Sequence, residues 1–197
     1  MPDVLHSTLS TTELHEPKGA DSATANQVYI ADGAGSGTWT TWPFGWGFYQ
    51  HNVAGQVFNT TASKLEIDGA GSATSEAYLP QGGSSLWDTT NDKILPMAVG
   101  DMYMLRIAIP IASKTASPTV FTLKVDIGGG ATPTTVISTR DISTANTAPF
   151  SIQIAFPVFI GSTALTNGIQ LFGSTNTGSV TLATGTEILI NRIYGDL

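Results

Sequence analysis

The residues best suited to covalent or acid–base catalysis are few and poorly spaced. Three histidines, His6, His15 and His51, could act as a general base. Serine hydrolases of the α/β type hold the nucleophile in a Gly-x-Ser-x-Gly turn between a strand and a helix. The nearest strings, Gly33–Gly37 and Gly69–Ala73, have the wrong spacing or lack the final glycine. We therefore expect no Ser-His-Asp arrangement.

Metal ligands and paired carboxylates give equally weak signals. The chain has no cysteine, and its first two histidines are nine residues apart without a metal-ligand spacing. Glycosidases need two carboxylates across a cleft, and the candidates are Asp88, Asp92, Asp101 and Asp126. Nothing in the sequence places two of them face to face, so we expect turn residues. The prediction is a non-enzymatic protein with no catalytic residues, no metal site and no cofactor.

Composition excludes further classes of protein. The formal net charge is −7, whereas a nucleic-acid-binding protein needs a basic face to displace counterions from phosphates. The longest apolar stretches are about half of a bilayer span and contain Pro110 and Pro157, so no membrane segment is expected. Met1–Ser10 has neither the basic nor the apolar region of a secretory signal. Only 12% of the residues are charged, which is low for the surface of a monomer.

The elements that would position any site are strands. Apolar and polar residues alternate along Met102–Ile111, Val120–Ile127 and Ser151–Ile160, which is typical of half-buried strands. No twelve-residue window shows a helical apolar stripe, so we predict an all-β fold, an antiparallel β-sandwich or jelly roll with an extended N-terminal arm. Shorter strands are predicted at Gln27–Ala31, Gln56–Asn59, Lys64–Asp68, Ala77–Leu79, Thr134–Thr139, Gly168–Phe172, Ser179–Ala183 and Glu187–Tyr194.

The chain changes character near residue 53. Residues 1–52 are predicted to form an arm and an aromatic neck, and residues 53–197 a jelly-roll domain. Aromatic faces can stack on sugar rings, but the shared strand parity of the even-numbered aromatic residues favours packing on a core or between subunits. The candidates for neck or subunit packing are Trp39, Trp42, Phe44, Trp46, Phe48, Tyr103 and Tyr194.

Several segments resemble a known family. The regions Ala77–Ile111, Val125–Gly130, Phe156–Ser174 and Ile188–Leu197 resemble the trimeric jelly rolls of the tumour-necrosis-factor and complement globular-head type, in the version found in bacteriophage virion proteins. A Gly-Asp turn opening a long alternating strand and an apolar final strand suit that topology. The segment Leu14–Thr41 resembles one that recurs in phage structural proteins.

The resemblance implies a homotrimer on the surface of a virion, synthesised in the bacterial cytoplasm. The arm would bind the major capsid protein or another virion protein, and a chain without a long shaft favours a head decoration or short head fibre. The alternative is a tail-fibre head that binds a host receptor or glycan, with Trp87 as a candidate contact. An arm without its own core becomes ordered when it docks. The anchoring candidates are Leu5, Leu9, Leu14, His15, Glu16, Pro17 and Lys18.

Two-sided strands support assembly. Met102 and Met104 alternate with Tyr103 and Leu105, so both faces of this strand carry apolar residues. Which face meets the core is left open by the sequence. A second covered face is expected where a neighbouring subunit packs, and it would also explain the low charge content.

Overall fold

The computed structural model describes residues 23–24, 27–31, 34, 37–41, 44–80, 82–115, 118, 120–127, 135–142 and 149–195. The contacts divide the chain into two compact units, residues 1–42 with residue 197, and residues 43–196. The boundary predicted from the sequence, between residues 52 and 53, lies one strand after this division.

The first unit contains a two-stranded antiparallel hairpin. Strand β1 (Gln27–Ala31) pairs with β2 (Gly37–Thr41), and Tyr29 lies opposite Trp39. The two rings are tilted by 60° with their centroids 5.4 Å apart, a spacing at which aromatic pairs attract. The predicted strand at Gln27–Ala31 is confirmed, and its partner strand had no prediction.

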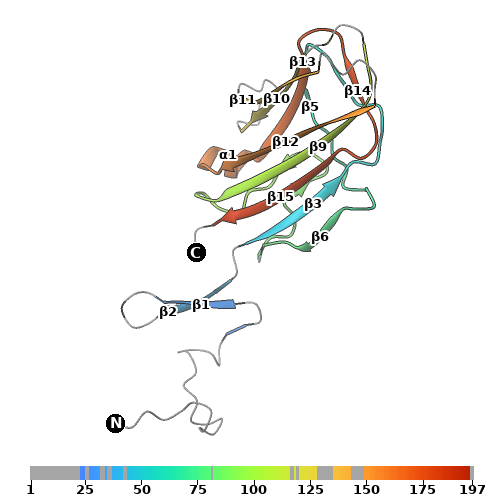
Figure 1. The fold of residues 1–197 in the computed structure, drawn as a ribbon. Coiled ribbons are helices and arrows are strands. Elements are labelled where there is room, and N and C mark those ends of the chain that lie inside the picture. Colours follow the sequence, from blue (N-terminus) through green and yellow to red (C-terminus); the bar gives the residue numbers. More distant parts are fainter. Residues whose placement is uncertain are drawn as a thin grey trace, which may run out of the picture. The chain divides into compact units, whose positions relative to one another are not determined.

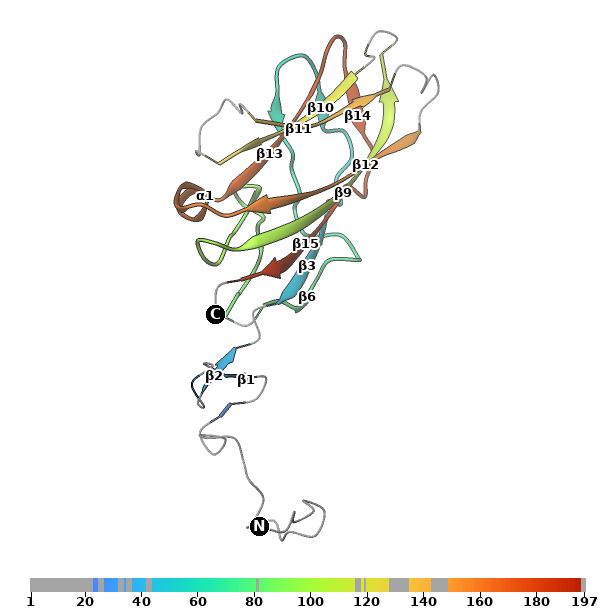
Figure 2. The same cartoon turned by 60° about the vertical axis from the view of Figure 1, so that its left-hand side comes forward.

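The second unit has two antiparallel sheets packed face to face (Figures 1 and 2). In the first sheet the long strand β9 pairs with β12 along one side, and with β15 and then β14 along the other. Strand β15 pairs with β3, β3 with the edge strand β6, and β14 with β4. The bounds are β3 (Gly45–Gln50), β4 (Val57–Phe58), β6 (Ser75–Tyr78), β9 (Met102–Lys114), β12 (Phe150–Phe159), β14 (Val180–Leu182) and β15 (Glu187–Tyr194).

The second sheet is built around β13, and a six-residue helix, α1 (Ser162–Asn167), connects β12 to it. No helix had been predicted. Among the described residues, no helix is long and apolar enough to span a membrane. The strands run in the order β11, β10, β13, β8 and β7, with β5 also on β13; their bounds are β5 (Ser63–Lys64), β7 (Trp87–Asp88), β8 (Lys93–Ile94), β10 (Val120–Asp126), β11 (Thr135–Asp141) and β13 (Ile169–Thr175).

The pairing is that of a jelly roll. Strand β3 pairs with β15, β5 and β8 with β13, β9 with β12, and β10 with β11. Each pair is nested inside the previous one along the chain, as in a long antiparallel hairpin wrapped into two sheets. The predicted all-β jelly roll is confirmed. Because β3 is the partner of the closing strand, the aromatic segment around it belongs to the jelly roll rather than to a separate neck.

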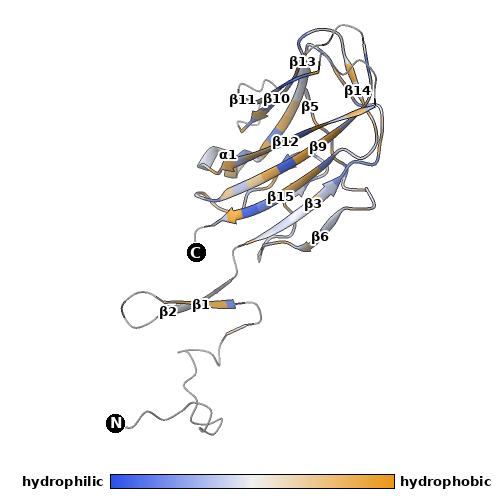
Figure 3. Cartoon of the chain, viewed as in Figure 1, coloured by the Kyte–Doolittle hydropathy of each residue, from blue (hydrophilic) through white to orange (hydrophobic). Residues whose placement is uncertain are grey.

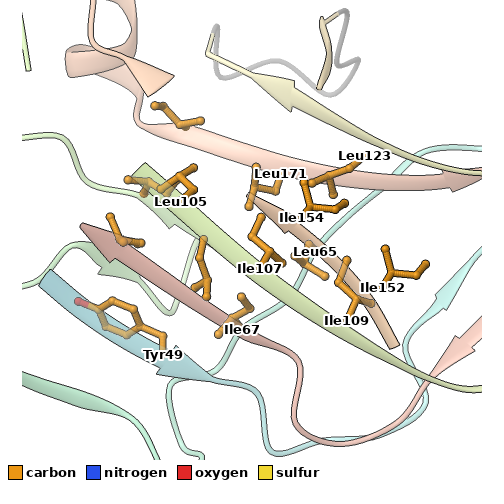
Figure 4. Packing of buried hydrophobic residues seen from close by; sticks show 14 of the residues in the cluster. Tyr49, Leu65, Ile67, Leu105, Ile107, Ile109, Leu123, Ile152, Ile154 and Leu171 are labelled. Atoms are coloured by element: carbon orange, nitrogen blue, oxygen red, sulfur yellow. The ribbon is translucent and has the colours of Figure 1, made fainter. Parts of the chain in front are cut away.

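Burial shows which face of β9 meets the core, a question that the sequence left open. In β9, Tyr103, Leu105, Ile107, Ile109 and Ile111 are all at most 2% exposed. They meet apolar side chains from both sheets (Figure 4), and full burial of such a side chain contributes about 1.5–3 kcal/mol. The odd-numbered residues of β9 thus face the core, and the even-numbered ones face outward.

The shortest predicted strands differ most from the structure. The strand predicted at Lys64–Asp68 is limited to Ser63–Lys64, although Leu65 and Ile67 are fully buried. The backbone of Ile67 bonds to side chains instead: its carbonyl accepts Trp87 Nε1–H, and its N–H donates to Asp92. Leu65 and Ile67 are buried without belonging to a strand. Their alternation with polar residues in the sequence is the same as that of a half-buried strand, and this explains the wrong prediction.

Candidate functional site

The predicted anchoring residues lie outside the described part of the chain. They remain predictions from the sequence. They are Leu5, Leu9, Leu14, His15, Glu16, Pro17 and Lys18.

Trp46 and Phe48 of β3 face away from the core. Gly47 and Tyr49 are buried, whereas Trp46 and Phe48 point to the outer face of the sheet and are only half-buried. Trp46 stacks on Tyr78 of β6, with centroids 4.9 Å apart and an interplanar angle of 27°. Of the two sequence alternatives for Trp46 and Phe48, packing in the interior core is therefore wrong, and packing between subunits stays a prediction.

The other aromatic candidates are dispersed. Phe44 is 40% exposed before β3, and Tyr194 is 57% exposed at the end of β15. Trp39 belongs to the β1–β2 hairpin of the first unit, and Trp42 lies outside the described residues. The structure therefore places Trp46 and Phe48 together on one strand, but does not unite the whole set.

Tyr103 is not on a surface that another subunit can reach. Its side chain is 0% exposed between the two sheets, so a packing role between subunits is wrong for this residue. Its hydroxyl donates to Asp101 Oδ2 over 2.9 Å and accepts the Met97 N–H over 3.1 Å. Burial and the neighbouring Asp101 carboxylate both raise its pKa above the usual range for tyrosine.

Asp101 forms a buried ion pair that the sequence analysis missed. Its Oδ1 lies 2.6 Å from Arg192 Nη2, and the Asp101 and Arg192 side chains are 0% and 6% exposed. The Ala98 N–H donates to Asp101 Oδ2 over 3.1 Å. We name Tyr103, Asp101 and Arg192 the interior network. Asp101 had been expected in an ordinary turn; the register between Arg192 and Tyr103, which brings these groups together, was not available from the sequence.

Residues on the outer face of the first sheet form rows across β12, β9, β15 and β3. Ala155 lies opposite Arg106, Arg106 opposite Leu189, and Leu189 opposite Phe48. A depression of about 480 Å³ lies over this row. We name it the outer depression; its lining includes Phe48, Arg106, Arg140, Gln153, Glu187 and Leu189.

The charged side chains of the outer depression make few ion pairs or hydrogen bonds with other described residues. Arg140 Nη2 donates to the Gln153 carbonyl over 3.2 Å. The ion pairs found within the described part of the chain include neither Arg106 nor Glu187. This face combines apolar side chains with two cations and one anion, without a fixed constellation of reactive groups.

A second hollow lies near the edge strands β6 and β7, one from each sheet. It has a volume of about 350 Å³, and we name it the edge pocket; its lining includes Tyr49, Thr74, Glu76, Ser85, Trp87 and Thr89. Glu76 Oε1 accepts the Tyr49 hydroxyl over 2.7 Å and the Ser85 hydroxyl over 2.6 Å. The Leu86 N–H in turn donates to the Tyr49 hydroxyl over 2.8 Å. We name Tyr49, Glu76 and Ser85 the edge network.

The protonation of the edge network follows from burial. Burial is the largest cause that raises the pKa of Tyr49 to about 12, and Glu76 adds to it while the Ser85 hydrogen bond opposes it. The phenol therefore keeps its proton to a higher pH than an exposed tyrosine does, and it donates to the carboxylate. Sequence reasoning missed this network because its members lie on three segments without a motif. Trp87, the predicted glycan contact on the pocket wall, is 2% exposed.

The remaining polar candidates have structural partners. Asp88 accepts the Thr90 and Asn91 N–H groups, and its hydrogen bond with the Asn91 side chain is the largest cause that lowers its pKa. The predicted turn role of Asp88 is confirmed. His51 is 5% exposed, and its Nδ1 accepts the Asp68 N–H over 3.2 Å. No group of three or more metal-ligating residues occurs among the described positions.

Comparison with known proteins yields a fold neighbour. No family model and no curated protein matches the chain. The chain is similar in structure to a tumour necrosis factor. That solved structure is Eiger TNF from S. frugiperda, with 14% sequence identity and a TM-score of 0.46 over 79% of this chain and 96% of that chain. The jelly-roll assignment itself rests on the nested strand pairs of this molecule, and the comparison assigns no role to any residue.

Proposed function

We propose that this protein is a non-enzymatic structural protein of a phage virion, a homotrimeric capsid decoration or short head-fibre protein. The jelly-roll body forms the trimer, and the N-terminal arm attaches it to the major capsid protein or another virion protein. The family resemblance of the sequence suggests this role. The structural observation that supports it is the set of exposed apolar side chains on the outer face of the first sheet, which also carries Arg106 and Glu187.

That outer face has the composition of a subunit interface. Along β9 and β12 the outward residues alternate with core residues, and few of the outward ones are charged. Figure 3 shows the hydropathy along these strands. The cores of homo-oligomer interfaces are likewise rich in aromatic residues and Met and poor in charge. The apolar outward residues are Trp46, Phe48, Met102, Met104, Ala108, Ala155, Pro157, Phe159 and Leu189.

A second copy of the chain is the occupant that we propose for this face. Phe159 is 65% exposed, and it lies opposite Met102, which itself pairs with Tyr194. Stable interfaces bury about 800 Å² on each partner, and covering apolar area contributes about 25 cal/mol per Å². In a threefold ring each subunit offers two different surfaces, so this face would pack against a different surface of its neighbour.

The attachment role rests on the first unit. The contacts of the chain separate between residues 42 and 43, so an arm can bind a partner without rearranging the jelly roll. Leu5, Leu9, Leu14 and Pro17 would supply apolar anchors, and the polar residues between them would fix the register. Docking of a short chain segment onto a folded partner is a common mode of recognition.

The oligomeric state is the first test. Light scattering should give three times the chain mass of 20.6 kDa at micromolar concentration. Leu189→Asp places a charge in the middle of the outer face, so we expect monomers that keep the circular dichroism of the wild type. Thr139→Asp, at an exposed position of β11, is the control and should remain trimeric. A monomeric wild-type protein would refute the trimer.

The attachment site is tested on virions. Deletion of residues 2–20 should leave the trimer intact but abolish its binding to undecorated heads. Antibody labelling of intact virions should mark the head. Binding of the truncated trimer to heads would show that the arm is not the anchor, and labelling of the tail would favour the receptor-binding alternative.

A further inference from the structure

The edge pocket is the best-organised polar site in the described part of the molecule, and it is formed by residues other than those that line the outer depression. It draws on Tyr49 from β3, Glu76 from β6, Ser85, and Trp87 from β7. We propose that the edge pocket binds a neutral sugar ring, with the Glu76 carboxylate as the acceptor for its hydroxyl groups. This inference deepens the glycan-binding alternative and does not depend on attachment to a virion head.

The Glu76 carboxylate is already oriented before any ligand arrives. Glu76 is exposed on edge strand β6. Its Oε1 nevertheless accepts hydrogen bonds from two hydroxyl groups, those of Tyr49 and Ser85. A glutamate side chain normally loses rotamer entropy on binding, and prior fixation removes part of that cost. The Ser85 hydroxyl gives its single proton to Glu76 and accepts the Trp87 N–H over 3.2 Å, so the donor itself is anchored.

The second oxygen of Glu76 is left for a ligand. The hydrogen bonds of the described residues use Oε1 and not Oε2. A carboxylate oxygen accepts hydroxyl protons in short, charge-assisted hydrogen bonds. Sugar hydroxyls are such donors, and the hydroxyls of Thr74 and Thr89 on the pocket wall can donate or accept in return.

The charge of the pocket selects a neutral ligand. Its lining contains the carboxylates of Glu76 and Asp88 and no lysine, arginine or histidine. An anionic sugar would be repelled. Asp88 is a poor acceptor for a ligand because both of its oxygens already accept hydrogen bonds from the Thr89–Asp92 turn.

Apolar groups complete the site. Leu95 and the edge of Trp87 line the pocket beside the polar groups. Trp87 is 2% exposed and is fixed by its Nε1–H bond to the Ile67 carbonyl over 2.8 Å, so it forms a rigid pocket floor and Leu95 supplies the apolar contact. Sugar rings carry C–H faces that contact aromatic and aliphatic side chains. The volume of about 350 Å³ lies within the range of small-ligand pockets, about 300–1,000 Å³.

A panel of neutral methyl pyranosides (glucose, galactose, mannose and rhamnose) tests the proposal by ligand-observed NMR on the intact chain at neutral pH. We expect at least one to bind with millimolar affinity. Glu76→Gln keeps an Oε1 acceptor for Tyr49 and Ser85 but replaces Oε2 with an NH₂ group. The affinity should fall about tenfold, equal to about 1.4 kcal/mol. Glu66→Gln, which changes an exposed glutamate outside the pocket, should bind as the wild type does.

A second variant separates loss of the site from loss of the fold. Thr89 is exposed on the pocket wall, so Thr89→Phe should fill the pocket and abolish binding with no change in melting temperature. Three outcomes would overturn the proposal: no binding of any neutral pyranoside, binding that survives both substitutions, or binding of only glucuronic acid, sialic acid or calcium. None of these outcomes bears on the oligomeric state or on attachment to heads.

Discussion

Two tyrosine–carboxylate networks lie in the same jelly roll, and they differ in how completely they are closed. In the interior network, Tyr103 and Arg192 both bond to Asp101, whose side chain has no exposed surface. In the edge network, Tyr49 and Ser85 bond to Glu76, which is exposed on an edge strand. Both networks join a tyrosine to an acidic side chain, but only the interior network includes a cation, Arg192.

The difference follows from solvation. A carboxylate in the core is stable only if a cation and further donors replace its water, and Asp101 receives these from Arg192, Tyr103 and the Ala98 N–H. Glu76 keeps contact with water, so hydroxyl donors on one oxygen suffice. A carboxylate whose two oxygens are both occupied, as in Asp101, holds β9 and β15 together but has no oxygen left for a ligand. Glu76 has one oxygen occupied, so it can hold its own network and still accept a ligand.

The largest effect should come from breaking the interior ion pair. Arg192→Leu leaves the Asp101 carboxylate buried without its cation, which costs about 3–5 kcal/mol in comparable cases. We expect a corresponding fall in the free energy of unfolding, measured with urea. Asp101→Leu combined with Arg192→Leu removes both charges and should recover most of the loss. If the free energy of unfolding fell by less than about 1 kcal/mol in Arg192→Leu, the ion pair would contribute no more than an exposed surface pair does, and the prediction would be wrong.

A smaller effect should separate the two tyrosines. Tyr103→Phe removes a donor to Asp101 and the acceptor of the Met97 N–H, so we expect a loss of about 2 kcal/mol, in the range for unsatisfied buried groups. Tyr49→Phe leaves the Leu86 N–H without its acceptor, but water can replace the hydroxyl at Glu76, and we expect about 1 kcal/mol. Equal losses in urea unfolding, or the reverse order, would contradict the difference in closure.

The strands that could be predicted from the sequence are those marked by a local alternation of apolar and polar residues. The alternation of β9, β10 and β12 depends on each strand alone, and those three strands were found almost within their bounds. In β3, Trp46 and Phe48 share one parity and Gly47 and Tyr49 the other, and the sequence left open whether Trp46 and Phe48 pack on the core or between subunits. The burial of Gly47 and Tyr49 in the folded sandwich shows that Trp46 and Phe48 lie on the outer face.

The candidate sites depended on contacts between distant segments. Asp101 and Arg192 are 91 residues apart, and Tyr49 and Glu76 are 27 apart. No spacing rule predicts such pairs, because the register of a sheet is fixed by all of its strands together. Glu76 in particular stands in the short edge strand β6, where a charged residue is the ordinary protection against edge-to-edge pairing, and so it carried no functional signal.

The smallest expected effect is the alkaline limit of stability, and it tests whether the edge tyrosine is a fixed donor. The pKa of Tyr49 is raised from 10.0 to about 12 in the folded chain. Between these values the unfolded chain releases this proton while the folded chain keeps it. The free energy of unfolding therefore falls as pH rises through that window, and the stabilisation is fully present below pH 10.

Urea unfolding across this range should show a shallower decline for Tyr49→Phe than for the wild type. The wild-type decline should persist in part in the variant, because the pKa of Tyr103 is raised as well. Identical slopes for the two proteins would mean that Tyr49 titrates as an exposed phenol and that the edge network is not held in the folded state.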